Sequence, residues 1–212
     1  LIRLSNESKQ HCVIIKTLFK NKGSLMHIKK LLFPVLFTSA LAVAENSVGI
    51  DINNEDFELL ASANLNVLAD YSSSTTYMMH AGYLNSDGDN LTSFGVSGES
   101  SLQGIEGLTL GLGTKLVFAD DFAALPLMAK AAYRLPFSDV VPPTSLIASF
   151  AYAPSVLTFS DGDSYSEFRT EADMEVISKI HVFAGYRNIK TDYEDMDRTF
   201  NNSFYGGMKL SF

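Results

Sequence analysis

The sequence is poor in cysteine, in basic residues and in long apolar runs. Its one cysteine, Cys12, lies before residue 44, so the rest of the chain cannot form a disulfide or a thiolate metal site. Residues 45–212 hold 23 of the 24 acidic residues but only nine of the 16 basic ones, which gives that part a net charge of −14. Nucleic acid is therefore disfavoured as a partner, because phosphate binding needs a basic surface.

The longest apolar segment is too short for a transmembrane helix. Such a helix needs about 20 apolar residues, whereas residues 31–44 supply only 14 positions. With Lys29 and Lys30 before it and Ala42-Val43-Ala44 at its end, the segment predicts a cleaved secretory signal peptide over residues 26–44. We expect residues 1–25 to be an upstream extension without a structural role, and residues 45–212 to form one domain.

A helical period is missing from residues 45–212, and alternation with a period of two takes its place. Phe168, Thr170, Ala172, Met174 and Val176 alternate with charged residues, which places the two sets on opposite faces of a strand. A helix would mix the two sets. The same alternation predicts nine strands, at residues 57–70, 76–85, 91–100, 108–118, 127–135, 145–153, 167–176, 180–190 and 203–212.

The predicted fold is all-β, a small transmembrane antiparallel up-and-down β-barrel of eight to ten strands. Barrels inserted from the periplasm have an even number of strands, and a tenth strand at residues 47–53 satisfies that parity. Eight strands with a loosely ordered N-terminus remain the alternative. The tight turn at residues 177–179 is expected on the periplasmic side, and the longer acidic loops at 154–164 and 191–202 on the outer side.

Alternation alone does not decide whether the apolar faces meet lipid or a dry core, as in a soluble periplasmic barrel of the lipocalin type that binds an apolar ligand. Lipid is favoured because lysine is scarce on the polar faces. It is also favoured by aromatic residues near the predicted strand ends, as in interfacial girdles: Tyr71, Tyr77, Phe118, Tyr133, Tyr152 and Phe204. The C-terminal strand presents Phe204, Met208, Leu210 and Phe212 on one face, which is typical of the signal read by the barrel assembly machinery.

Three segments resemble the YfaZ family of predicted outer-membrane proteins: Tyr152-Ala-Pro-Ser-Val-Leu157, Tyr165-Ser-Glu-Phe-Arg-Thr-Glu-Ala-Asp173 and Val182-Phe-Ala-Gly-Tyr-Arg-Asn-Ile189. The resemblance extends over most of residues 45–212. It implies a small barrel of Gram-negative bacteria, and it brings no catalytic residues with it.

The charged faces predict a filled lumen. An isolated buried charge is costly, so charges in a narrow barrel must be paired. The residues expected to form this lumen charge network are Lys115, Lys130, Arg134, Glu167, Arg169, Glu171, Asp173, Glu175, His181, Arg187 and Lys209. A salt-bridged plug is the favoured interpretation, and a narrow passive, porin-like channel for small solutes or ions is the alternative.

Catalytic, cofactor and metal sites are not expected. Only two histidines, His80 and His181, follow residue 44. Serines and acidic residues are so numerous that a Ser, His and Glu triad can be assembled from the sequence by chance, so such a match does not indicate catalysis. A lipid A or peptide hydrolase or acyltransferase is therefore a minor alternative. Acidic pairs such as Asp161 and Asp163 can bind calcium, but turn-forming Asp-Gly pairs explain them as well. We expect a monomer in the outer membrane of a Gram-negative bacterium, with the lipids and lipopolysaccharide of that membrane as partners.

Overall fold

The computed structural model describes residues 46–66, 74–136, 142–193 and 196–212. All of them belong to one of two compact units of the chain, Val43–Phe212. The predicted extension, the signal peptide and Tyr71 lie outside the described residues.

The described chain is almost entirely β-structure. No helix within these residues is long and apolar enough to cross a membrane. The elements are β1 (Ser47–Ile52), β2 (Asp56–Asn64), β3 (Thr75–Ser86), β4 (Asp89–Ser101), β5 (Leu108–Ala119), β6 (Phe122–Ala124), β7 (Leu127–Arg134), β8 (Thr144–Ala153), the 3-10 turn η1 (Ser155–Leu157), β9 (Thr158–Ser160), β10 (Gly162–Ile177), β11 (Ile180–Tyr193) and β12 (Thr199–Ser211).

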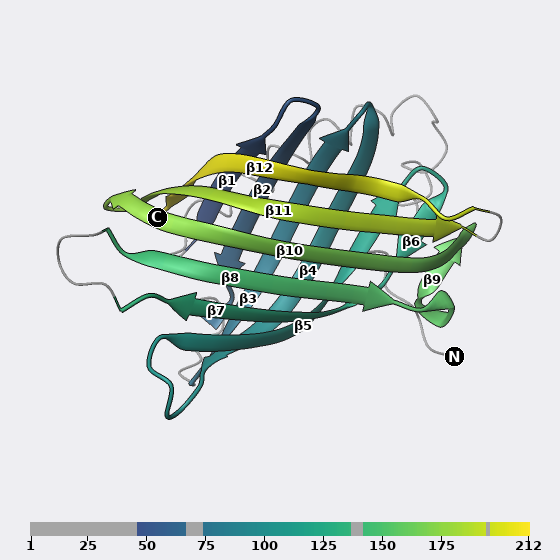
Figure 1. Ribbon diagram of the computed structural model, residues 1–212. Helices are drawn as coiled ribbons and strands as arrows, with labels where there is room; N and C mark the ends of the chain where they lie inside the picture. Colours follow the sequence, from purple (N-terminus) through teal and green to yellow (C-terminus); the bar gives the residue numbers. More distant parts are fainter. Residues whose placement is uncertain (1–45, 67–73, 137–141, 194–195) are drawn as a thin grey trace, which may run out of the picture. The chain divides into compact units, whose positions relative to one another are not determined.

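The strands close into a barrel (Figure 1). They form one 12-stranded antiparallel sheet, in which β4 also pairs with β5 and the first strand, β1, pairs with the last, β12. The three-residue strands β6 and β9 pair with each other and continue the β7 and β8 hairpin past a break. Without these two extensions, ten strands complete the ring among the described residues, which confirms the parity argument and excludes eight.

The two ends of the barrel differ. At one end, here called the terminus end, Ser47 pairs with Ser211 and the chain turns tightly between β10 and β11. At the other, the loop end, the chain turns at Asn53–Glu55 between β1 and β2 and at Asp87-Gly88 between β3 and β4. Asp87, with a φ of 50°, and Gly88, with a φ of 88°, close the second of these turns in the left-handed conformation that Asp and Gly tolerate best.

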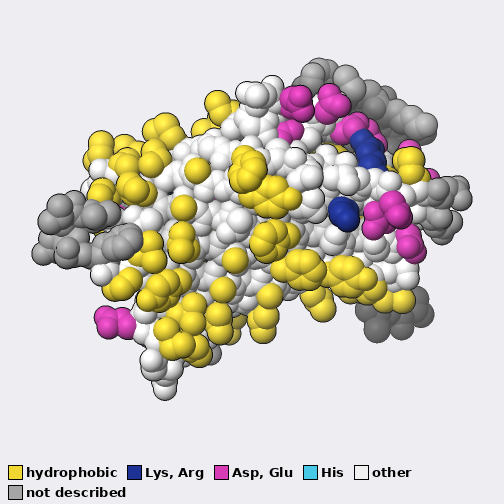
Figure 2. Space-filling view, viewed as in Figure 1, with side chains coloured by type: hydrophobic (Ala, Val, Ile, Leu, Met, Phe, Trp, Pro, Cys, Tyr) yellow, Lys and Arg dark blue, Asp and Glu magenta, His cyan; other side chains and the backbone are white. Residues whose placement is uncertain are grey.

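Apolar side chains cover the outer wall, and charged ones point inward. Leu112 is 72% exposed and Phe204 78% exposed, whereas Arg187 and Asp51 are fully buried. Figure 2 shows apolar side chains spread along the wall of β5, β7, β8 and β10 to β12. The lipocalin-like alternative is therefore wrong, because a soluble barrel would expose its charges to water and bury its apolar faces.

The aromatic residues predicted at the strand ends face outward where the structure describes them. Tyr77 is the third residue of β3, near the terminus end, and Phe118 and Tyr152 lie towards the loop end of β5 and β8. All three are exposed on the outer wall. Their positions fit two girdles at the edges of an apolar band.

The strands are longer at the loop end than the sequence predicts. The predicted loop at 154–164 contains η1 and β9, and β10 begins at Gly162. Likewise β11 runs to Tyr193 and β12 starts at Thr199, which shortens the predicted loop at 191–202. The reason is that strand pairing joins backbones, so it continues past the membrane band where side chains no longer need to alternate in polarity.

Candidate functional site: the filled lumen

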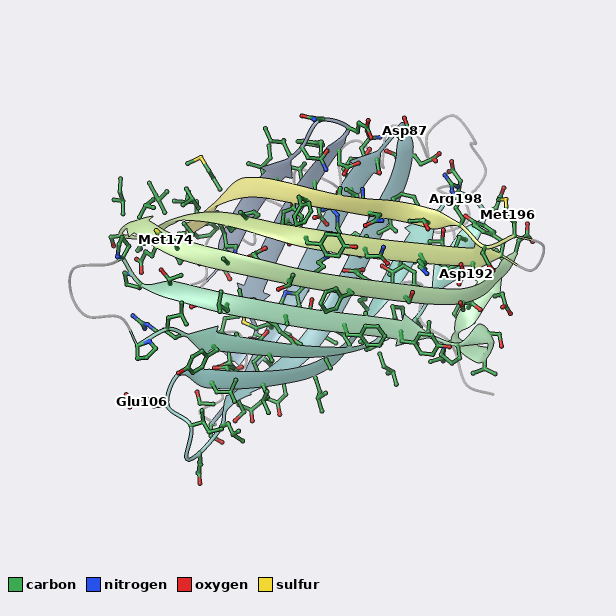
Figure 3. All side chains as sticks on the ribbon, in the orientation of Figure 1. Asp87, Glu106, Met174, Asp192, Met196 and Arg198 are labelled. Atoms are coloured by element: carbon green, nitrogen blue, oxygen red, sulfur yellow. The ribbon has the colours of Figure 1, made fainter. Side chains whose placement is uncertain are left out.

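The strand register decides which charges share the lumen. Residues paired across two strands lie on the same face, so the pairs Arg169 with Arg187 and Glu171 with Gly185 fix the inward set of β10 and β11. The side chains between the strands in Figure 3 fill the barrel, with Glu106 marking its terminus end and Arg198 its loop end.

A chain of ion pairs crosses the lumen. We call it the ionic bar, and it runs in the order Lys115, Glu167, Arg169, Glu58, Arg187 and Asp51. Arg169 holds Glu58 with both terminal nitrogens, at 2.7 and 2.8 Å, and its Nε lies 2.6 Å from Glu167. Because Lys115 is on β5, Glu58 on β2 and Arg169 on β10, the bar joins strands that are not neighbours in the ring.

The members of the bar are packed as well as paired. Basic and acidic side chains alternate along it, so each has a neighbour of the opposite type, as burial demands, and Arg187 also lies 3.6 Å from Asp56. The Tyr165 hydroxyl donates to Glu167, and the Arg187 guanidinium lies 5.0 Å from the centre of the Tyr205 ring. Gly185 leaves space for that ring, since a Cβ there would lie 2.7 Å from Tyr205.

Two smaller clusters lie nearer the terminus end. Lys130 Nζ is 2.9 Å from Glu99 Oε1. Lys209 Nζ is 2.9 Å from Asp173 and 3.5 Å from Glu171, and His181 Nδ1 lies 2.7 Å from the other oxygen of Asp173. Lys130 and Lys209 keep 26% and 23% of their side-chain surface exposed, so water reaches this half of the lumen.

An apolar cluster closes the loop end of the lumen. We call it the apolar seal, and all its members are buried. Phe122 packs against Tyr165 at a ring distance of 6.1 Å and against Tyr193 at 5.5 Å. Its buried members are Leu84, Leu91, Val117, Phe122, Ala124, Ala151, Ala153, Tyr165, Ile189 and Phe200. Tyr165 belongs to both regions, because its ring packs in the seal and its hydroxyl reaches the ionic bar.

Most residues of the predicted charge network lie in these clusters, but two do not. Arg134 ends β7 and is exposed, and the Glu175 carboxylate accepts a hydrogen bond from the Lys179 backbone in the turn. Both face the lumen by register but sit at its rim. Sequence reasoning missed Asp51, Glu58 and Glu99, although Glu58 lies on the polar face of its strand; only barrel closure shows that it meets Arg169.

The lumen offers little for catalysis or metal binding. Within the described ranges no group of His, Cys, Asp and Glu is suited to hold a metal ion. His80 Nε2 lies 2.9 Å from Ser97 Oγ, the spacing of a base and a nucleophile. Ser97 is buried, however, and its hydroxyl also lies 3.4 Å from Glu99. We assign the pair to the hydrogen bonding of the lumen.

The residues of the predicted assembly signal share the outer face of β12. Phe204, Met208 and Leu210 are exposed there. Phe212 follows the strand, and its backbone exchanges two hydrogen bonds with Asn46, at 2.9 and 3.0 Å. Recognition of these residues by an assembly machinery remains a prediction.

Comparison with known proteins gives one family and a set of barrels. The family model described as "YfaZ precursor" matches residues 37–212. No curated protein matches the chain. A structure titled "Bacterial polysaccharide outer membrane secretin" is similar at 12% identity, with 78% of this chain and 68% of that chain covered and a TM-score of 0.44. Two porin structures are also similar, and each alignment covers 80% of this chain and 99% of the porin. They are the KdgM porin in complex with disordered oligogalacturonate, at 9% identity and a TM-score of 0.43, and the NanC porin, at 9% identity and a TM-score of 0.41.

Proposed function

The chain belongs to the YfaZ family, and from this premise we propose that it is an outer-membrane β-barrel of structural or interaction type whose lumen is closed to solutes. The outer membrane is supported by the family and by the apolar outer wall, where a charge would cost about 2–4 kcal/mol at the bilayer midplane. The proposal includes no catalytic activity.

The observation that carries the closed lumen is the stacking of two barriers along one path. A solute entering from the loop end meets the apolar seal, a cluster of buried apolar side chains contributed by strands around the lumen. Behind the seal the ionic bar joins β5, β10 and β2 across the lumen. An ion would have to displace paired charges there, at a cost of several kcal/mol.

The loop end then faces the cell exterior. Both chain termini of the barrel lie at the opposite end, as expected when a barrel is inserted from the periplasm. Acidic side chains including Asp87, Asp120 and Asp161 occupy the loop end. We propose that this end is the interaction surface of a monomer, with outer-membrane lipids and lipopolysaccharide around it and the barrel assembly machinery contacting β12.

Planar-bilayer recording tests the closed lumen. The purified and refolded protein should give no reproducible single-channel steps at physiological salt, because both barriers remain intact at moderate voltage. Refolding is checked by heat-modifiable gel mobility, so that silence is not due to unfolded protein. Reproducible steps from folded protein would contradict the proposal.

A narrow channel is the second candidate, and one observation favours it. The terminus half of the lumen is polar and reached by water, as the partly exposed Lys130, Lys209 and His181 show. A channel would need the apolar seal to open and the ionic bar to let ions pass beside it. Conductance that appears after the seal alone is removed would favour this candidate.

A further inference from the structure

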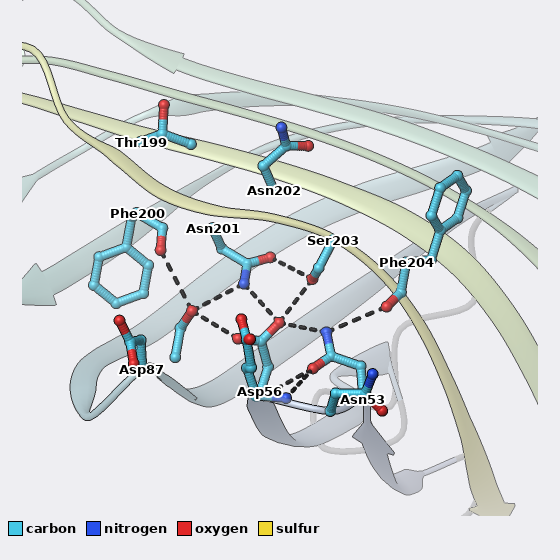
Figure 4. A pocket seen from close by; sticks show the side chains of 12 residues that line it. Asn53, Asp56, Asp87, Thr199, Phe200, Asn201, Asn202, Ser203 and Phe204 are labelled. Atoms are coloured by element: carbon cyan, nitrogen blue, oxygen red, sulfur yellow. Dashed lines mark hydrogen bonds between the residues drawn. The ribbon is translucent and has the colours of Figure 1, made fainter.

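A polar pocket lies at the loop end, beside the closure of the barrel. Its volume is about 650 Å³, and it is bounded by the β1–β2 turn, the β3–β4 turn and the first half of β12 (Figure 4). We call it the seam pocket. Its twelve lining residues comprise four Asn, two Ser, one Thr, three carboxylates and two Phe.

The pocket exists because β1 is shorter than its neighbour. β1 has six residues and pairs only with residues 206–211 of β12, whereas β12 has 13 and continues to Thr199. The first half of β12 therefore lacks β1 beside it. Side chains of the two turns bridge the gap instead of a backbone ladder.

The floor of the pocket is held in place by Asp56. Its carboxylate accepts hydrogen bonds from Ser86, Asn201 and Ser203, at 2.7 Å each, and from Asn53 at 2.5 Å. These bonds are visible in Figure 4. The floor is thus a fixed set of amide and hydroxyl groups, while Asn54, Glu55 and Asp87 stand exposed around it.

The lining excludes several classes of occupant. None of the twelve residues is Lys, Arg or His and three are carboxylates, so phosphate and other anions are repelled. No metal-binding group occurs in the described part of the chain. An added peptide strand is disfavoured, because the carbonyl of Phe204 that it would need already accepts a hydrogen bond from the Asn53 amide (3.2 Å).

We propose that the seam pocket binds an uncharged saccharide, either free or as the headgroup of a glycolipid in the adjacent leaflet. Saccharide hydroxyls donate and accept hydrogen bonds at once, and amide side chains offer both kinds of partner within one group. The volume is within the usual range for small-molecule sites. The inference goes beyond the proposed function, and it stands whether or not the lumen conducts; only the glycolipid source rests on the membrane orientation.

Saturation-transfer NMR on the refolded protein, in a detergent without a sugar headgroup, tests the proposal. The free sugars are maltotriose and glucose, and glucose 6-phosphate is the charged counterpart of glucose. The lipid probe is a vesicle of phosphatidylcholine that contains digalactosyl diacylglycerol, compared with a vesicle of phosphatidylcholine alone. We expect transfer to the neutral sugars and at least tenfold weaker binding of the phosphate. Signal from maltotriose indicates a free saccharide, and signal from the galactolipid headgroup alone indicates a lipid-borne one.

The variant Asn54→Ala should weaken binding about fivefold, since it removes an exposed amide and leaves the Asp56 floor intact. The matched control is Asn90→Ala, an exposed Asn at the same end that does not line the pocket. Heat-modifiable mobility confirms folding of both. The proposal is overturned by absence of transfer to every neutral probe, by equal binding of glucose 6-phosphate, or by an equal effect of Asn54→Ala and the control.

Discussion

The two regions that fill the lumen do so by different means. The apolar seal has ten buried members, and all of them except Tyr165, whose hydroxyl donates to Glu167, are buried without needing one particular polar partner. The ionic bar has six members, and each depends on a named neighbour on another strand. Apolar packing responds to lost volume, whereas a buried ion pair responds to a lost partner. Substitutions of similar size should therefore have different costs in the two regions.

The largest effect is expected from Arg187→Ala in the ionic bar. Arg187 is fully buried against Asp51, Asp56 and Glu58. Its loss leaves the buried Asp51 carboxyl without its basic partner and Glu58 with Arg169 alone. We expect the free energy of unfolding to fall by about 3–5 kcal/mol. Urea unfolding in micelles, followed by gel mobility, measures it.

Arg198→Ala is the matched control for that variant. Arg198 also pairs with a carboxylate, Asp89, but both side chains are more than 30% exposed. Exposed pairs contribute about 1 kcal/mol at most. Equal losses in the two variants would mean that the ionic bar is not buried as described.

Leu84→Ala in the apolar seal should come next. Leu84 is completely buried, and truncation of such a side chain costs about 3 kcal/mol, within a usual range of about 2–5. The variant should remain silent in planar bilayers, because the ionic bar still crosses the lumen. Leu112→Ala on the outer wall is the control and should cost clearly less. Single-channel steps from Leu84→Ala would show that the seal is the sole barrier.

The smallest effect is expected at the isolated pair of Lys130 and Glu99. Each is partly reached by water, so Lys130→Met or Glu99→Gln alone should cost about 1 kcal/mol. The double variant should recover part of that cost, because no unpaired charge remains. A double-mutant cycle of unfolding free energies gives the coupling. A coupling between Lys130 and Glu99 as large as that between Arg187 and Glu58 would remove the energetic distinction between the ionic bar and this smaller cluster.

Alternation predicted nine strands and the direction of their faces, because each lipid-facing strand must satisfy the same constraint at every second residue. The tenth strand was predicted only from the even number of strands in such barrels. Phe168 and Leu110 point outward, while Glu167 and Asp173 are buried. Strand ends at the loop end were predicted less well, since no lipid constrains residues such as Asp192 and Thr199.

The apolar seal could not be predicted from alternation. Val117, Leu84 and Ile189 occupy the inner faces of their strands, but a local pattern does not separate an apolar residue facing the lumen from one facing lipid. The ion pairs were out of reach for another reason: Glu58 and Arg169 are 111 residues apart and meet only through the closure and stagger of the barrel.

Quenching by brominated lipids tests most directly that apolar residues meet lipid and charged ones are enclosed. The sequence contains no Trp, so Phe168→Trp on the outer face of β10 and Phe183→Trp inside the barrel each carry a single indole reporter. Acyl chains brominated near the bilayer centre should quench the indole of the Phe168→Trp variant strongly and leave that of the Phe183→Trp variant nearly unaffected. Strong quenching of the Phe183→Trp indole, together with an unquenched Phe168→Trp indole, would contradict the assignment of Phe168 to the lipid-facing side and Phe183 to the lumen.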